Sequence, residues 1–259
     1  MEGRKLIVAG AISNRENEIE PVLDNIKRIC TLFDDVKCIF VESDSTDSTY
    51  RVLQQACINK NINADCHTLG CLRYKFPHRT GRIAAARNFY LDQVEENYSD
   101  YDYLLVIDFN EANTEPIDLD CVLSNFKYNN WDMICANQAQ IYYDLWALRH
   151  PIWMPFDCWD HRNAPDYMSF NEKHNYCVRS RFKHIPYDME LIEVESAFGG
   201  TAFIKISSIK NARHESLTEE GRETCEWISF CKKINNGVSK IYINPGFINQ
   251  RRLSRHAQI

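Results

Sequence analysis

The amino-terminal half of the sequence alternates short apolar runs with segments whose apolar residues recur at helical spacing. The runs, each the length of a strand, are 5–12, 36–41, 62–66 and 103–107. The helix-like segments between them are 19–30, 49–56 and 80–94. Strands and helices that alternate in this way form a parallel sheet with helices on both faces. The sequence therefore predicts an α/β fold of Rossmann-like type, with a mixed, mainly parallel sheet.

The second half is less regular but still supplies elements of the same kind. Residues 138–187 are rich in aromatic residues and proline without clear periodicity, which favours an irregular wall over a site. The remaining expected elements are a helix near 118–126, a strand over 131–137, regular structure over 194–206, a helix over 225–234 and a strand over 240–243. A chain of 259 residues with 44% hydrophobic residues can bury one sizeable core, so we predict a single domain over 1–259.

Composition excludes several classes of protein. The formal charge of -6 argues against a nucleic-acid partner. No apolar run approaches the roughly 18 residues of a membrane span, and 6–12 reads as a strand rather than a signal peptide. Eleven scattered cysteines favour reduced thiols and a cytoplasmic protein. The compact group Cys66-His67 with Cys71 lacks a second ligand pair for zinc.

Two of the predicted strands end in polar and acidic residues. Glu42, Ser43 and Asp44 follow the run 36–41, and Asp108 and Asn110 follow the run 103–107. The carboxyl ends of parallel strands meet at one edge of a sheet, where open α/β folds bind nucleotides. These two acidic strand ends together predict one binding site for a sugar nucleotide.

The strand-end motifs resemble those of the nucleotide-sugar-dependent glycosyltransferases of the GT-A fold. The run 42–49, Glu-Ser-Asp-Ser-Thr-Asp-Ser-Thr, is similar to the DDGSTDGT pattern of the large inverting family of that fold, and 13–16 is similar to its TYNRE-like turn. Gly81 with 85–88 resembles its G-x-x-AARN segment, with one extra residue of spacing. The resemblance implies that residues 1–110 bind the nucleotide, with Glu42, Ser43 and Asp44 at the base or ribose and Arg87 at the donor phosphates.

A divalent metal follows from the same resemblance. Asp108-Phe109-Asn110 stands where these enzymes carry a D-x-D motif that holds Mn²⁺ or Mg²⁺ on the donor diphosphate, so residues 111–259 together with Asp108 and Asn110 would serve metal, sugar and acceptor. Asn110 replaces the second Asp and is a weaker ligand. Three readings stay open: reduced metal affinity, a missing contact supplied by Glu111 or a late His, or reliance on Arg and Lys instead.

The resemblance also implies a catalytic base. In the inverting family a carboxylate opens a helix eleven positions before a Gly, and Glu226 and Gly237 are separated by the same distance. Glu226 is the expected base, which takes the proton of the acceptor hydroxyl. The alternative is a solvated Glu that stabilises the helix dipole. Glu193 and Glu195 are weaker candidates for a site carboxylate.

A narrower resemblance covers residues 142–149. This run, Tyr-Tyr-Asp-Leu-Trp-Ala-Leu-Arg, is similar to a segment of fungal capsule-associated mannosyltransferases and of a chlorella-virus rhamnosyltransferase domain. It implies sugar or phosphate contacts for Asp144 and Arg149, which could otherwise form a buried ion pair that fixes a loop. Gly199 and Gly200 match a turn beside the transferred sugar, or else a plain bulge. The basic tail, 250–256, could cover the diphosphate or stay mobile.

The resemblances together imply transfer of a hexose or deoxyhexose from a UDP-, GDP- or dTDP-linked donor to a glycan or glycoconjugate hydroxyl. The Glu226 spacing implies inversion at the anomeric carbon, whereas the mannosyltransferases that resemble 142–149 are retaining. A sugar-phosphate nucleotidylyltransferase is the alternative enzyme, although the segment after the first strand is poor in Gly. A non-catalytic glycan-binding protein is the third reading, because Asn110 weakens the D-x-D motif.

Overall fold

One mixed sheet forms the centre of the computed structural model, which describes residues 2–252, with strand order β3-β2-β1-β4-β7-β5-β8-β6. The strands are β1 (Lys5–Ile12), β2 (Asp35–Glu42), β3 (Ala64–Thr68), β4 (Tyr103–Ile107), β5 (Met133–Gln138), β6 (Ile192–Val194), β7 (Thr201–Lys205) and β8 (Ile241–Gln250). The first four strands pair in parallel. The prediction of an α/β fold with a mixed, mainly parallel sheet is confirmed.

Strand β7 runs antiparallel to both of its neighbours, β4 and β5. The start of β7 therefore lies at the same edge of the sheet as the ends of β1, β2 and β4. Because Thr201 pairs with Ile107, the turn before β7 lies beside the residues that follow β4. This topology brings residues from about 200 together with residues from about 108.

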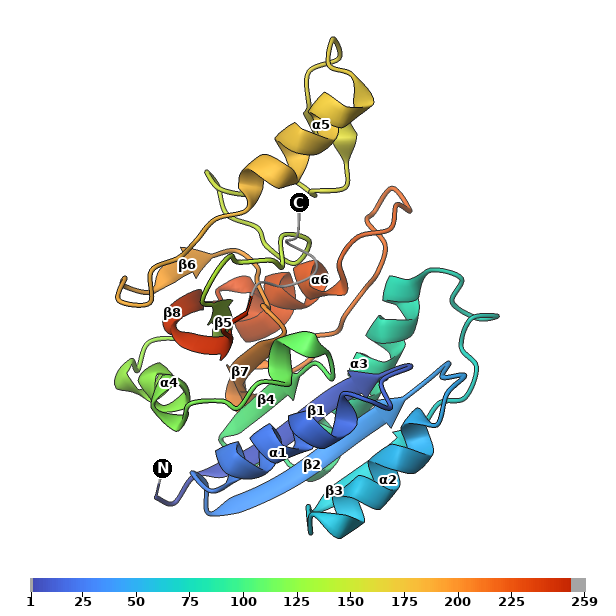
Figure 1. Ribbon diagram of the computed structural model, residues 1–259, viewed down its shortest axis with the longest axis vertical. Coiled ribbons are helices and arrows are strands. Elements are labelled where there is room, and N and C mark those ends of the chain that lie inside the picture. Colours follow the sequence, from blue (N-terminus) through green and yellow to red (C-terminus); the bar gives the residue numbers. More distant parts are fainter. Residues whose placement is uncertain (1, 253–259) are drawn as a thin grey trace.

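Helices cover both faces of the sheet (Figure 1). They are α1 (Ile19–Cys30), α2 (Thr49–Asn59), α3 (Arg79–Asn97), α4 (Leu119–Leu123), α5 (Phe170–Cys177) and α6 (Glu226–Lys233). Along β1, Ile7 and Ala9 enter one core with α3 and α6, whereas Leu6 and Val8 enter the other with α1 and α2. The alternation follows from the two-residue period of a strand, and it makes the sheet apolar on both faces.

Residues 139–191 leave the sheet as a long excursion, which carries α5 well beyond the edge of the sheet (Figure 1). The expected irregular stretch is present, but α5 was not predicted. A capping box between Ser169 and Glu172 begins this helix, and its S-x-x-E pattern was available in the sequence.

Several elements differ from their expected bounds by one to three residues, and two differ by more. The helix expected near 118–126 is α4 followed by a 3₁₀ segment, Ser124–Lys127. The last strand was expected to end at 243, yet β8 continues through Pro245 to Gln250. A register shift against β5 accommodates the proline, and Asn137 Nδ2 donates to the Pro245 carbonyl at 3.1 Å.

Between residues 2 and 252, no helix combines the length and the apolar character needed to cross a bilayer. The cytoplasmic location stays a prediction.

Candidate active site

Two adjoining cavities form one groove at the carboxyl ends of β1, β2 and β4. Their volumes are about 400 and 380 Å³, and both are lined by Arg79, Ile83, Arg87, Asp108 and Asn110. The first cavity is the basic half, which also contains Ser13, Asn14, Arg15, Ser43, Asp44, Arg73 and Arg82. The second is the aromatic half, which also contains Tyr143, Asp144, Trp146, Trp159, His174, Phe182, Phe198, Glu226 and Trp227. Arg87 and Asp108 therefore lie at the junction of the two halves.

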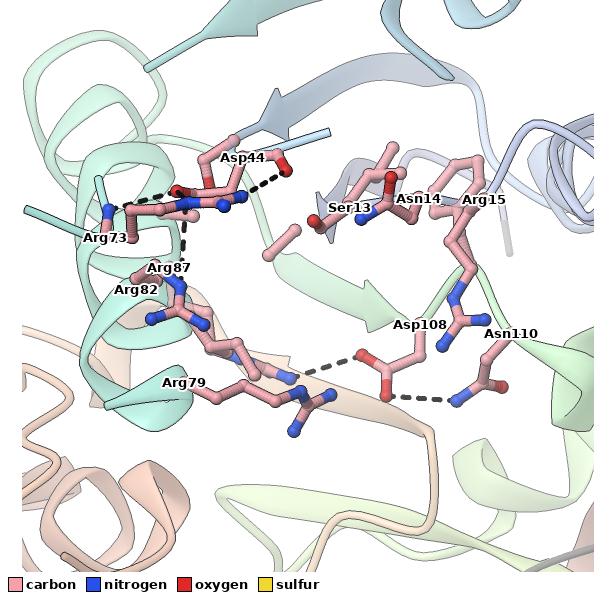
Figure 2. A pocket seen from close by; sticks show the side chains of 16 residues that line it. Ser13, Asn14, Arg15, Asp44, Arg73, Arg79, Arg82, Arg87, Asp108 and Asn110 are labelled. Atoms are coloured by element: carbon pink, nitrogen blue, oxygen red, sulfur yellow. Dashed lines mark hydrogen bonds and ion pairs between the residues drawn. The ribbon is translucent and has the colours of Figure 1, made fainter. Parts of the chain in front are cut away.

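One face of α3 supplies most of the positive charge in the basic half. Arg79, Arg82 and Arg87 lie at helical spacing on this face, and Arg15 and Arg73 approach from loops (Figure 2). Five arginines thus line this half, against the two carboxylates of Asp44 and Asp108. Such an excess of positive charge attracts an anion, and arginine pairs with phosphate oxygens in particular.

Asp44 is held in an uncommon backbone conformation at the floor of the basic half. Its φ is 59°, in the left-handed region, and its Oδ1 accepts hydrogen bonds from the backbone N–H groups of Leu72 and Arg73 at 2.9 and 3.0 Å. Its Oδ2 lies 3.7 Å from Arg82 Nε and has no hydrogen-bond partner within the described residues. A buried oxygen in this state can accept a hydrogen bond from a ligand.

The strand-end prediction places Glu42 at the ligand, but its carboxylate is engaged by the protein. Its Oε1 accepts from the Ser45 N–H at 2.9 Å, and its Oε2 accepts from the Thr68 hydroxyl at 2.5 Å. The groove wall at this strand end consists of Ser43 and Asp44. Glu42 thus shapes the loop that carries those two residues.

The junction holds a buried cation between two carboxylates. Arg87 Nη2 donates to Asp108 Oδ1 at 3.2 Å, and Arg87 Nε lies 3.3 Å from Glu226 Oε1. The guanidinium carbon also lies 4.8 and 4.4 Å from the ring centroids of Phe198 and Trp227. Burial raises the pKa of both carboxyl groups, and the charge of Arg87 offsets part of that rise. The Glu226 side chain is only 6% exposed, whereas that of Asp108 is 29% exposed.

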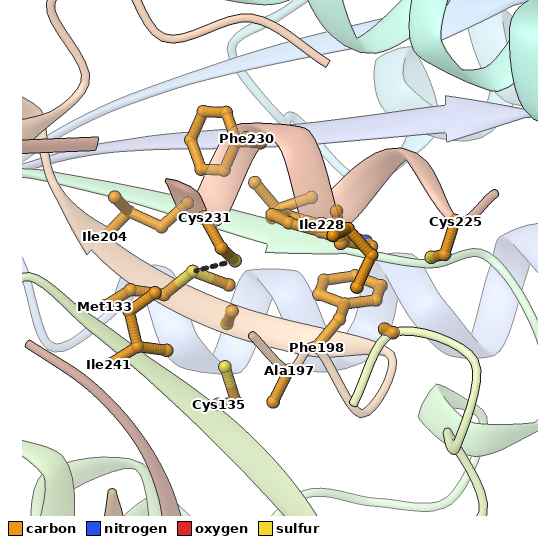
Figure 3. Packing of buried hydrophobic residues seen from close by; sticks show 14 of the residues in the cluster. Met133, Cys135, Ala197, Phe198, Ile204, Cys225, Ile228, Phe230, Cys231 and Ile241 are labelled. Atoms are coloured by element: carbon orange, nitrogen blue, oxygen red, sulfur yellow. Dashed lines mark hydrogen bonds between the residues drawn. The ribbon is translucent and has the colours of Figure 1, made fainter. Parts of the chain in front are cut away.

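Glu226 is held in place by the packing of the helix that it begins. Figure 3 shows α6 on the sheet, with Cys231 beside Met133. On the other side, the ring of His214 stacks on Phe230 at 4.5 Å, and its Nδ1 lies 3.1 Å from the Glu226 carbonyl oxygen. The carboxylate therefore enters the groove from a well-anchored helix end. The alternative of a solvated Glu does not match this position, because the side chain is only 6% exposed.

The Gly199-Gly200 turn is buried and positions the site carboxylates. The Gly199 N–H donates to Asp144 Oδ2 at 2.9 Å, and the Gly200 carbonyl accepts from the Asp108 N–H at 2.9 Å. A Cβ at Gly199 would lie 2.4 Å from the Ala136 carbonyl oxygen, so no side chain fits. The structure places these glycines beneath the groove, where they hold Asp108 and Asp144.

Asp144 and Arg149 lie apart despite their closeness in sequence. Asp144 lines the aromatic half, and burial raises its pKa to about 6. Arg149 forms an ion pair with Asp157 at 3.1 Å and donates to the Trp146 and Leu148 carbonyls. The alternative ion pair between Asp144 and Arg149 is therefore not formed. Arg149 pairs with Asp157 instead, and this ion pair fixes the 146–157 loop.

The weaker candidates lie elsewhere. Glu193 and Glu195 are exposed beside a separate cavity that also contains Arg149. Arg251 and Arg252 lie near Asp118 and Glu115, at 3.6 and 3.7 Å. The rest of the basic tail, 253–256, lies outside the described residues.

The residues around Asp108 do not fit a divalent ion held by a D-x-D motif. Asn110 Oδ1, the atom that would bind a metal, accepts a hydrogen bond from the Ala112 N–H at 3.0 Å and caps the following turn. Asn110 Nδ2 is then directed at Asp108 Oδ2, at 3.3 Å. A cation beside Asp108 would face this N–H group and the Arg87 guanidinium. Within residues 2–252, no group of three or more His, Cys, Asp and Glu side chains is arranged for a metal.

Sequence reasoning missed several groove residues. Arg79 and Arg82 share a helical face with Arg87, and this spacing was a usable signal. Arg15 lies in the turn motif 13–16, which gave it no role in binding. Trp227 and Phe198 stack on each other and both contact Arg87, but they carry no signal in the sequence because they meet only in the folded chain.

Comparison with known proteins supports the fold. No family model and no curated protein matches the sequence. Two crystal structures of Staphylococcus aureus TarS 1-349, one of them in complex with UDP, are similar with TM-scores of 0.50 and 0.51. They are 13% and 15% identical to this chain, and each match covers 92% of this chain and 57% of TarS 1-349. The chain has the GT-A-like fold that its motifs predict, and it spans little more than half of TarS 1-349.

A third similarity is more limited. The mannosyltransferase PcManGT from Pyrobaculum calidifontis, solved in complex with GDP-Man and Mn²⁺, matches 51% of this chain and 35% of its own, with 17% identity and a TM-score of 0.38. A similarity of this extent gives no information about the site residues of this chain. The narrower resemblance of residues 142–149 stays a prediction.

Proposed function

We propose that this chain is a nucleotide-sugar-dependent glycosyltransferase that moves a hexose or deoxyhexose to a hydroxyl group of a glycan or glycoconjugate. The observation that carries the proposal is the junction, where Arg87 stands between Asp108 on the basic side and Glu226 on the aromatic side. A basic chamber joined to an aromatic chamber at the buried Arg87 suits a donor diphosphate, a sugar and an acceptor in that order.

The donor occupies the basic half in this proposal. The nucleoside lies against Ser43 and Asp44, and a ribose hydroxyl or a base N–H supplies the hydrogen bond that Asp44 Oδ2 lacks within the described residues. The diphosphate lies among the arginines of α3, which places the sugar at the junction. UDP-, GDP- and dTDP-linked sugars are the candidate donors.

The acceptor occupies the aromatic half. Its wall includes Trp146, Trp159 and Phe182, and flat apolar faces of this kind pack against sugar rings. Trp159 is 55% exposed, which leaves its ring accessible to a glycan that enters the groove.

Glu226 serves as the general base. Its carboxylate takes the proton of the acceptor hydroxyl while that oxygen forms a bond to the anomeric carbon. The bond from this carbon to the phosphate oxygen breaks, and its electron pair leaves with the nucleoside diphosphate. Attack from the aromatic half on a sugar whose diphosphate lies in the basic half inverts the anomeric carbon. Burial raises the pKa of Glu226, which makes its carboxylate a stronger base than that of an exposed glutamate.

The test is turnover of nucleotide sugars with glycan acceptors, followed by NMR assignment of the product anomer. We expect release of nucleoside diphosphate and an inverted product. Glu226→Gln should lower kcat by about 10²- to 10⁴-fold with little change in nucleotide affinity. The matched control is Glu195→Gln, an exposed glutamate outside the groove, which should keep wild-type turnover.

Four results would contradict the proposal. Full activity of Glu226→Gln would remove this residue from the mechanism, and a retained anomer would exclude single-step inversion. Nucleotide binding without turnover of any donor would favour the glycan-binding reading. Formation of a nucleotide sugar from a sugar phosphate and a nucleoside triphosphate would identify a nucleotidylyltransferase.

A further inference from the structure

We propose that the basic half of the groove binds a nucleoside diphosphate through arginine side chains alone, without a divalent cation. The inference rests on the proposed function, since it concerns the leaving group of the same donor. It differs from what the D-x-D resemblance implies, and it follows from the hydrogen bonding of Asn110 and from the placement of the arginines.

The side-chain amide of Asn110 directs its Nδ2 group, and not its oxygen, toward Asp108. Its Oδ1 must face the Ala112 N–H, because an amide turned the other way would direct Nδ2 hydrogens at that N–H group. The turn Glu111–Asn113 therefore fixes Nδ2 toward Asp108, where it donates to Oδ2. At the position of a second metal ligand, the protein presents a hydrogen-bond donor.

Positive charge surrounds the Asp108 carboxylate. Arg87 Nη2 donates a hydrogen bond to Asp108 Oδ1, and Asn110 Nδ2 donates one to Oδ2. Both oxygens of this carboxylate therefore already have donors from the protein. Figure 2 shows Arg79 and Arg15 directed at the space in front of Asp108, one from α3 and one from the loop after β1. A dication there would meet three guanidinium groups, which repel it.

Arg79 and Arg87 keep hydrogen-bond donors that are available for a ligand. Arg79 makes no ion pair within residues 2–252. The Nη1 atom of the buried Arg87 has no hydrogen-bond partner in the described part of the chain, whereas its Nε faces Glu226. Planar guanidinium groups bind phosphate oxygens in a bidentate manner, so Arg79 and Arg87 can neutralise the diphosphate that a metal would otherwise bind.

The test is calorimetric titration of the chain with UDP, GDP, dTDP and inorganic pyrophosphate, each in EDTA and in MnCl₂. We expect at least one nucleoside diphosphate to bind with a Kd that differs by less than about twofold between the two conditions. Arg79→Gln should weaken this binding about tenfold or more, as expected for a lost charge-assisted contact. Arg28→Gln, an exposed arginine at the far end of α1, is the matched control and should bind as the wild type does.

Asn110→Asp provides the converse experiment. It restores a D-x-D motif, so we expect weaker binding in EDTA and recovery with MnCl₂. Thermal unfolding of each variant checks that it is folded. Binding by the wild type that disappears in EDTA would overturn the inference, and so would the absence of binding under both conditions.

The outcomes separate this inference from the proposed function. Metal-independent binding without sugar transfer refutes only the proposed function. Sugar transfer with metal-dependent binding refutes only the inference.

Discussion

Arg87 Nε lies 3.3 Å from Glu226 Oε1, and the two side chains are 4% and 6% exposed. They come from helices α3 and α6, far apart in sequence, and meet where the two halves of the groove join. An ion pair this deep is costly to break on one side only, because the remaining charge stays buried without compensation. The same contact therefore matters for folding and for the proposed chemistry.

Arg87→Met should destabilise the fold by about 3–5 kcal/mol. It leaves the buried Glu226 and the partly exposed Asp108 without the cation that they share, so the pKa values of both carboxyl groups rise further. A raised carboxyl pKa in the folded state costs stability as the pH rises through it, so the deficit should be larger at about pH 8 than at about pH 5. Urea unfolding at both pH values measures this. Arg87→Lys, which keeps the charge, should recover part of the loss, and an equal deficit at both pH values would contradict the argument.

The acid limb of the pH profile should report Glu226. Burial raises the pKa of this carboxyl despite the opposing charge of Arg87, and only the deprotonated form can act as a base. We expect kcat/KM to fall as the pH decreases through a value above the roughly 4.3 of an ordinary Glu. Profiles of kcat/KM for the wild type and for Glu195→Gln should coincide. A wild-type rate that stays constant down to pH about 4.5 would show that no raised carboxyl is required.

Asp144→Asn should stabilise the protein at neutral pH and have little effect in acid. The folded-state pKa of Asp144 is about 6, above the roughly 3.9 of an unfolded Asp, so its burial favours the protonated form. The stability linked to this proton is present below about pH 4 and is lost as the pH rises through about 6. Asparagine can still accept the hydrogen bond from Gly199 N–H. Tm should therefore increase at about pH 8 but not at about pH 4, and the reverse order would contradict the assignment.

Gly199→Ala should be much more harmful than Gly221→Ala. Both glycines have positive φ, 68° and 74°, so alanine costs about 1–2 kcal/mol at either position. Only at Gly199 would the new Cβ clash, 2.4 Å from the Ala136 carbonyl oxygen, whereas nothing lies within 4 Å of it at Gly221. Chemical denaturation should show an excess loss of about 1–3 kcal/mol for Gly199→Ala. Equal losses would mean that the turn can move without cost.

The sequence was sufficient for the elements that follow from local periodicity. The strands β1 and β4 and the helix α1 have the predicted limits, because their apolar residues recur with the period of a strand or a helix. Asp44, Arg87, Asp108 and Glu226 all line the groove, and their roles stay predictions. The resemblance to GT-A enzymes added the order of these parts.

Only the tertiary structure decided how individual atoms are used. Glu42 and Asp44 look equivalent in sequence. Ser45 and Thr68 donate hydrogen bonds to the Glu42 carboxylate, whereas Asp44 Oδ2 has no hydrogen-bond partner within the described residues. Asn110 could have been a metal ligand until the backbone of Ala112 fixed the direction of its amide. Hydrogen bonds and ion pairs depend on groups distant along the chain, and the period of a helix or strand carries no information about them.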